Sequence, residues 1–219
     1  MPIENICLRD DVEIPWIISR CVEEVERRGM DEVGIYRLSG SITVISQLRK
    51  KFDLKPLNCA MHDVDINCIT GLLKSFLRQL PVALFTDKLH QDFIAAFHSL
   101  FVKDAKTEMD AAVEAENDRT RVLLTLFSSL PKLNQTIILY LLKHLVRVSN
   151  NEGQNKMSLN NLATVFGPSL MWPALLKSTT TADLPTYVGN GTIDVLAQSG
   201  VLYFFLRRLK CCLPVKLPE

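Results

Sequence analysis

Residues 14–40 read IPWIISRCVEEVERRGMDEVGIYRLSG, and the fold prediction begins with the two patterns in this stretch. Apolar residues recur at helical spacing in its first half, and these are Ile14, Ile17, Ile18, Cys21, Val22 and Val25. Pro15 suits the first turn of a helix, and Gly29 suits its end. The sequence therefore predicts a helix over residues 14–28, followed by a loop bounded by Gly34 and Gly40.

The same apolar spacing predicts helices along the rest of the chain. We expect them at residues 41 or 43 to 52, 65–79, 87–100, 135–150, 158–166 and 192–210, and we expect residues 105–129 to form a long helix or a loose segment leading into one. Asp65 is a suitable N-cap for the helix at residues 65–79. Gly167-Pro168 is expected to end the helix at residues 158–166. Residues 178–191 are rich in Thr, Gly and Pro and are expected to form a loop.

No segment shows the alternation typical of a strand, and no internal repeat or linker interrupts the core region. The sequence therefore predicts an all-α fold, a single irregular bundle of about eight to nine helices. We expect one domain over residues 1–219, with its core at about residues 6–208.

Composition excludes several classes of function. The 25 basic and 24 acidic residues give a net charge of +1, which is not typical of a nucleic-acid-binding chain. Apolar stretches are too short for direct membrane insertion. The six cysteines form no C-x-x-C pair and the N-terminus does not resemble a signal peptide, so we expect a cytoplasmic protein without a metal site. Cys211 and Cys212 follow a basic cluster, which leaves palmitoylation open beside the simpler interpretation of a fraying terminus.

The loop Gly34-Ile35-Tyr36-Arg37-Leu38-Ser39-Gly40 carries the first functional candidate. We expect Ile35 and Leu38 to anchor it to the core, which would turn Arg37 outward. A guanidinium on an anchored loop can neutralise the charge that develops during phosphoryl transfer, because its planar group binds two oxygens at once. Taken alone, the loop favours the simpler interpretation of an ordinary exposed arginine.

Two later stretches carry further polar candidates. Lys74 and Arg78 lie one helical turn apart, opposite the leucines of LLKSFLRQLP, and no acidic residue three or four positions away relieves their repulsion. Asn161 is expected to be exposed, opposite the apolar face of SLNNLATVFGPSL. In isolation, each is also consistent with a solvated surface residue.

Together the three stretches resemble the RhoGAP domain family, the GTPase-activating domains for Rho, Rac and their relatives. The matching blocks are EVGIYRLSG, GLLKSFLRQLP and NKMSLNNLATVFGPSL, in the family's order and at similar separations. The resemblance covers about residues 6–208, and the opening block looks most similar to the breakpoint-cluster-region (Bcr and Abr) type.

The resemblance implies roles for four residues. Arg37 takes the place of the arginine finger, which enters the active site of the partner GTPase. Lys74 and Arg78 take the places of residues that support the finger loop and contact the GTPase, and Asn161 that of a residue that contacts it near its switch regions. The expected partner is a Rho-family GTPase, with Rac-type favoured. It supplies GTP and Mg²⁺, so the domain needs no cofactor, and we expect a monomer that is recruited to membranes, if at all, through regions outside this chain.

The chain departs from the family pattern at two places. The family commonly continues L-P-x-P-L after the basic helix. Here the sequence is Leu80-Pro81-Val82-Ala83-Leu84, so alanine stands where the family has its second proline. This change puts the rigidity of the connection and the partner preference in doubt. Residues 103–118 are acidic and alanine-rich, and we expect them to form a surface insertion.

Two other classes of function remain open. The first is a binding module that keeps the fold but does not accelerate hydrolysis. The second is an enzyme with its own active site, for which candidate groups are Ser39, the cysteines and His62, His90, His98 and His144. No hydrolase, zinc-protease or kinase motif supports an enzyme, and His144 lies in an apolar helix, where a structural role is favoured.

Overall fold

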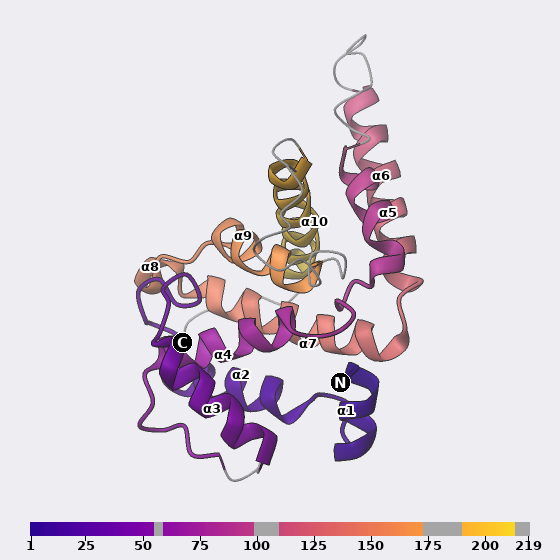
Figure 1. The fold of residues 1–219 in the computed structure, drawn as a ribbon. Helices are drawn as coiled ribbons and strands as arrows, with labels where there is room; N and C mark the ends of the chain where they lie inside the picture. The colour runs from indigo at the N-terminus through magenta and orange to yellow at the C-terminus, as the bar shows by residue number, and fades with distance from the viewer. Residues whose placement is uncertain (55–58, 99–109, 173–189, 213–219) are drawn as a thin grey trace.

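The computed structural model describes residues 1–54, 59–98, 110–172 and 190–212, and within these residues it is all-helical, as predicted. Figure 1 shows its ten helices. They are α1 (Ile3–Asp10), α2 (Trp16–Arg28), α3 (Ile42–Leu54), α4 (Ile66–Arg78), α5 (Asp87–His98), α6 (Asp110–Ser128), α7 (Lys132–Asn150), α8 (Glu152–Asn155), α9 (Leu159–Leu170) and α10 (Asn190–Cys212).

Helices α1 and α8 are the two that the sequence pattern did not predict. Helix α1 has eight residues, of which only Ile3 and Cys7 are buried, so its apolar pattern is too short to indicate a helix. Helix α8 has four residues and is followed by its C-cap Lys156, whose φ of 61° is left-handed. The remaining helices follow the predicted order, and Asp65 caps α4 by accepting a 2.7 Å hydrogen bond from the backbone N–H of Asn67.

The prediction that Gly167-Pro168 ends a helix is wrong, because α9 continues to Leu170. The carbonyl of Gly167 still accepts a hydrogen bond from the N–H of Met171 at 3.1 Å. A Cβ atom at Gly167 would lie 2.8 Å from the backbone nitrogen of Ser199 on α10. Glycine therefore allows α9 and α10 to pack backbone against backbone, and this tertiary contact outweighs the local helix-breaking signal.

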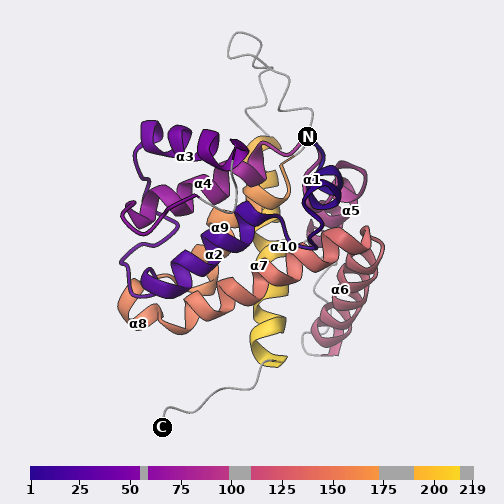
Figure 2. The same ribbon diagram turned by 90° about the horizontal axis from the view of Figure 1, so that it is seen from below.

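The helices form two connected groups around one apolar core. Helix α4 packs on α2, α3 and α9, while α10 packs on α5, α7 and α9, so α9 joins the two groups. Helices α5 and α6 lie side by side at one side of the bundle (Figures 1 and 2). No helix in the described ranges is both long and apolar enough to cross a membrane.

Some predicted segments fall outside the described residues. These are residues 99–100 of the fourth predicted helix, residues 103–109 of the expected insertion and residues 178–189 of the expected loop. Residues 110–118 of the expected insertion belong to α6. Residues 190–191 begin α10, so the loop prediction is wrong at that end.

The contact between α9 and α10 gives a testable prediction. We expect Gly167→Ala to lower the free energy of unfolding by about 1–3 kcal/mol, because the added methyl group must push two backbones apart. Gly153→Ala is the matched control, since a Cβ there meets no atom within 4 Å. Urea unfolding of both variants tests this, and equal stability of the two would contradict the packing argument.

Candidate functional site

The connection between α2 and α3 holds the predicted finger loop, residues 34–40. Gly34 begins the loop with a φ of 74°, a region that favours glycine. Its carbonyl accepts hydrogen bonds from the N–H of Arg37 at 2.8 Å and of Leu38 at 2.9 Å. These bonds close a tight turn whose exposed residues include Arg37.

The apolar anchors of the loop differ in part from the prediction. Ile35 is fully buried, as predicted, but the side chain expected to be the second anchor, Leu38, is 47% exposed. Tyr36 is the second anchor and is fully buried, although its φ of 68° is left-handed. The strained backbone at Tyr36 turns the chain so that Tyr36 faces inward while Arg37 and Leu38 face outward. The positions of the apolar residues in the sequence do not reveal such a turn.

Arg37 is exposed at the surface, as predicted. Within the part of the chain that the structure describes, its guanidinium forms no hydrogen bond or ion pair, and one of its nitrogens lies over Gly34. An arginine with no internal partner keeps all five N–H donors for an external anionic group. The loop therefore presents a positive charge that no described residue neutralises.

Lys74 holds the finger loop from α4. It is half-buried, rather than on an open surface as predicted, and its Nζ donates a hydrogen bond to the carbonyl of Tyr36. Burial, and to a lesser degree the positive charge of Arg78, lowers the pKa of Lys74 to about 8. The lysine thus joins α4 to the residue immediately before Arg37.

Arg78 holds a second contact of the same helix. Its side chain is exposed, and its Nε donates a 3.0 Å hydrogen bond to Oγ of Ser169 on α9. The Ser169 hydroxyl in turn donates to the carbonyl of Val165 at 3.3 Å. Lys74 and Arg78 therefore link α4 to two different parts of the domain, and both carry positive charge.

Asn161 lies in the first turn of α9. Its backbone N–H donates to Oγ of Ser158, the N-cap, at 3.1 Å. Its side-chain amide donates to the carbonyl of Lys156 at 3.2 Å, and the residue is half-buried rather than exposed as predicted. The amide oxygen of Asn161 remains without a partner among the described residues.

Asn155 connects the finger loop to this part of the domain, and sequence reasoning assigned it no role. Its fully buried amide donates to the carbonyls of Met30 at 2.8 Å and Val148 at 2.9 Å, and accepts from the N–H of Met157 at 2.8 Å. Its backbone carbonyl accepts from Gly34 at 2.8 Å. An asparagine after a helix reads as a loop residue, so only its position at the start of NKMSLNN could have indicated a function.

The connection after α4 contains the departure at Val82-Ala83. Val82 is exposed and Ala83 is buried. The N–H of Phe85 donates to the carbonyl of Leu170 at 3.2 Å, and Asn134 donates to the carbonyl of Leu84 at 2.8 Å. Contacts from α7 and α9 thus hold this connection without a second proline, while its effect on partner preference stays a prediction.

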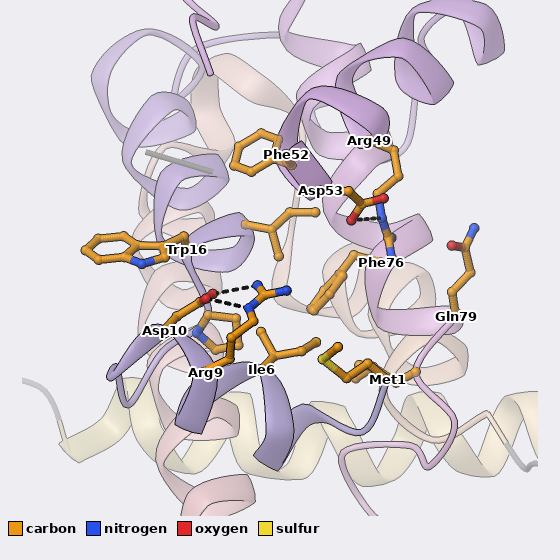
Figure 3. Close-up of a pocket in the computed structure, with 13 residues that line it drawn as sticks. Met1, Ile6, Arg9, Asp10, Trp16, Arg49, Phe52, Asp53, Phe76 and Gln79 are labelled. Carbon is orange, nitrogen blue, oxygen red and sulfur yellow. Dashed lines mark hydrogen bonds and ion pairs between the residues drawn. The ribbon is translucent and has the colours of Figure 1, made fainter. Parts of the chain in front are cut away.

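A cavity of about 230 Å³ between α1, α2, α3 and α4 is a separate feature (Figure 3). None of the four predicted site residues lines it. Its charged side chains pair with one another, Arg9 with Asp10 at 2.7 Å and Arg49 with Asp53 at 3.4 Å. No group of three or more potential metal ligands occurs in the described ranges. The candidate site is therefore the exposed surface around the finger loop.

This domain presents an arginine on an anchored loop that has no partner among the residues the structure describes, and α4 carries two further cations. Such an arrangement is suited to act on an anionic group held by another protein. The family profile of the RhoGAP domain matches residues 15–175. The chain therefore belongs to the RhoGAP domain family, whose members act on small GTPases.

Comparisons with known proteins give similar relatives. The chain is 39% identical over 210 residues to the breakpoint cluster region protein of Homo sapiens and 38% identical over 207 residues to the active breakpoint cluster region-related protein of Xenopus tropicalis. Each alignment covers 94% of this chain but only 15% and 22% of the relatives, respectively. The resemblance to the breakpoint-cluster-region type is thus confirmed.

Solved structures agree with the fold. The crystal structure of human Rho GTPase activating protein 15 superposes with a TM-score of 0.74 at 29% identity, over 95% of this chain and 88% of that chain. The BH domain of the GTPase regulator associated with focal adhesion kinase gives a TM-score of 0.67 at 28% identity, over 93% of this chain and 95% of that chain.

The buried amide of Asn155 provides a test of how the loop is held. We expect Asn155→Ala to lower the free energy of unfolding by about 1–3 kcal/mol, because the carbonyl of Met30 and the N–H of Met157 lose the side-chain amide as their partner and the Val148 carbonyl keeps only the N–H of Asn151. Asn160→Ala on exposed α9 surface is the matched control and should change it by less than about 0.5 kcal/mol. Urea unfolding measures both, and a neutral Asn155→Ala would contradict the assignment.

Proposed function

We propose that this domain binds GTP-loaded Rho-family GTPases and accelerates their GTP hydrolysis by inserting Arg37 in trans. The observation that carries the proposal is that the finger loop places an exposed arginine directly after a buried and hydrogen-bonded tyrosine. Tyr36 is buried and hydrogen-bonded from two sides, while the adjacent Arg37 is exposed and has no partner in the described part of the chain. Family membership supports the same function.

The chemistry follows from charge. Negative charge spreads over the transferred phosphoryl group and the leaving oxygen in the transition state, and a guanidinium placed there stabilises that charge. An arginine supplied in trans accelerates hydrolysis by about 10³ to 10⁵ in small GTPases. GTP and Mg²⁺ belong to the partner in this proposal, so the domain contributes no active site of its own.

Docking would involve the polar residues beside the loop. Lys74 and Arg78 place two positive charges on one side of α4, and Asn161 has an amide oxygen that is free to accept a hydrogen bond from a partner. Similarity to the breakpoint-cluster-region type is the basis for proposing a Rac-type GTPase as the preferred partner. We further propose that the domain acts in the cytoplasm as a monomer.

The first test removes the finger. We expect Arg37→Ala to reduce the accelerated rate about a thousandfold or more while leaving association largely intact, because Arg37 acts on charge that exists only in the transition state. Single-turnover GTP hydrolysis measures the rate, and binding to the GTPase loaded with a non-hydrolysable GTP analogue measures association.

A panel of Rac, Rho, related and Ras proteins serves as the control for specificity, with each GTPase also measured alone. Acceleration that survives Arg37→Ala would refute the finger assignment. Binding without acceleration by the unaltered domain would instead identify a non-activating binding module. The fastest acceleration on a GTPase other than Rac would contradict the proposed preference.

A second test uses the pKa of Lys74. The protonated ammonium donates to the Tyr36 carbonyl and its positive charge favours an anionic partner, so activity should fall as the ammonium loses its proton when pH rises through about 8. At low domain concentration the stimulated rate reports the free domain, and we expect a loss approaching about tenfold per pH unit. Lys74→Arg is the matched variant, because its guanidinium stays protonated and should remove this loss. A flat profile to pH 9.5 for the unaltered domain would contradict the role of the charge.

A further inference from the structure

A chain of hydrogen bonds runs from the partly exposed Glu26 through the buried His144 to Tyr36, the residue before Arg37. The hydroxyl of Tyr36 lies 2.6 Å from Nε2 of His144, and Nδ1 of His144 lies 2.7 Å from a carboxylate oxygen of Glu26. The three residues come from the finger loop, α7 and α2. We propose that Glu26, His144 and Tyr36 form a positioning chain that sets the backbone conformation of the finger loop and thereby aims Arg37.

The backbone at Tyr36 needs such support. Its φ of 68° is a conformation that residues with a Cβ rarely adopt, and it persists where surrounding contacts determine it. The ring packs edge-to-face on Phe166 with centroids 4.8 Å apart, and the carbonyl accepts from Lys74. The hydroxyl is the third contact, and it fixes the far end of the side chain.

The direction of the hydrogen bonds follows from the chemistry of the groups. Glu26 also accepts from Arg147 at 2.9 Å, and hydrogen bonds from His144 and Arg147 lower its pKa, so its carboxylate is ionised and can only accept. Nδ1 of His144 therefore carries the proton that is donated. Burial lowers the pKa of His144, and the neutral ring leaves Nε2 as an acceptor for the Tyr36 O–H.

Each member therefore has a defined task. Glu26 fixes which nitrogen of His144 carries the proton, and the fully buried His144 provides the acceptor for the fully buried Tyr36 hydroxyl. Removing the Tyr36 hydroxyl keeps the aromatic ring in the core but removes the hydrogen bond that fixes the far end of the side chain. The finger loop should then spend less time in the geometry that aims Arg37, while the docking residues on α4 and α9 are unchanged.

The inference rests on the proposed function, and Tyr36→Phe tests it. We expect the rate at saturating domain to fall about 10- to 100-fold, because small errors in the placement of a reacting group carry costs of this size. The concentration for half-maximal acceleration should change less than twofold. Tyr203→Phe is the matched control, since it removes a hydroxyl from the exposed surface of α10, away from Glu26, His144 and Tyr36.

Hydrogen exchange gives a readout that does not depend on GTP hydrolysis. In Tyr36→Phe the N–H groups of Arg37 and Leu38 should exchange several-fold faster, while those of the α7 core keep their protection. A uniform increase across the domain would overturn the proposal in favour of a general loss of stability. An unchanged saturating rate in Tyr36→Phe would also overturn it.

A second pair of variants keeps the test valid if Tyr36→Phe fails to fold. Glu26 is half-exposed, and Glu26→Gln retains an oxygen that accepts from Nδ1 of His144, whereas Glu26→Ala does not. We expect Glu26→Gln to retain more of the saturating rate than Glu26→Ala, and equal losses would overturn the chain. Undiminished acceleration by Arg37→Ala would be a failure of the proposed function instead, and the exchange data would still report on the loop.

Discussion

The left-handed backbone at Tyr36 is the constraint on which the rest of the site depends. For a residue with a Cβ this conformation costs about 1–2 kcal/mol of conformational free energy, so contacts with the surrounding structure have to stabilise it. Lys74 binds its carbonyl, His144 binds its hydroxyl, and Phe166 packs against its ring. Three helices thereby converge on one residue, and the exposed side chain that follows it is placed as a result.

The supporting contacts use polar groups that are costly to bury. Desolvation opposes the charge on Lys74 and lowers its pKa, and Arg78 one turn away adds repulsion. The domain keeps both cations on α4 although neither has an acidic partner among the described side chains. Such an arrangement is unfavourable for an isolated fold, and it becomes favourable once an anionic surface is nearby.

Much of the fold could be predicted from the sequence, because long amphipathic helices such as α2, α4 and α7 carry clear periodicity. The exposed position of Arg37 was also predicted, although of the two expected anchors only Ile35 is buried. The inward turn of Tyr36 and the continuation of α9 through Pro168 could not be predicted, since each depends on contacts with distant segments. For the same reason, the hydrogen-bond partners of Asn155 could not be predicted from the residues next to it in the sequence.

The distribution of these contacts along the chain has a consequence for biosynthesis. Three residues that hold the loop of Arg37 are synthesised more than a hundred residues after it, and these are His144, Asn155 and Phe166. Until they arrive, the nascent arginine lacks the geometry that would distinguish it from any other surface cation. The conformation of the finger loop is therefore fixed late, as a property of the completed fold.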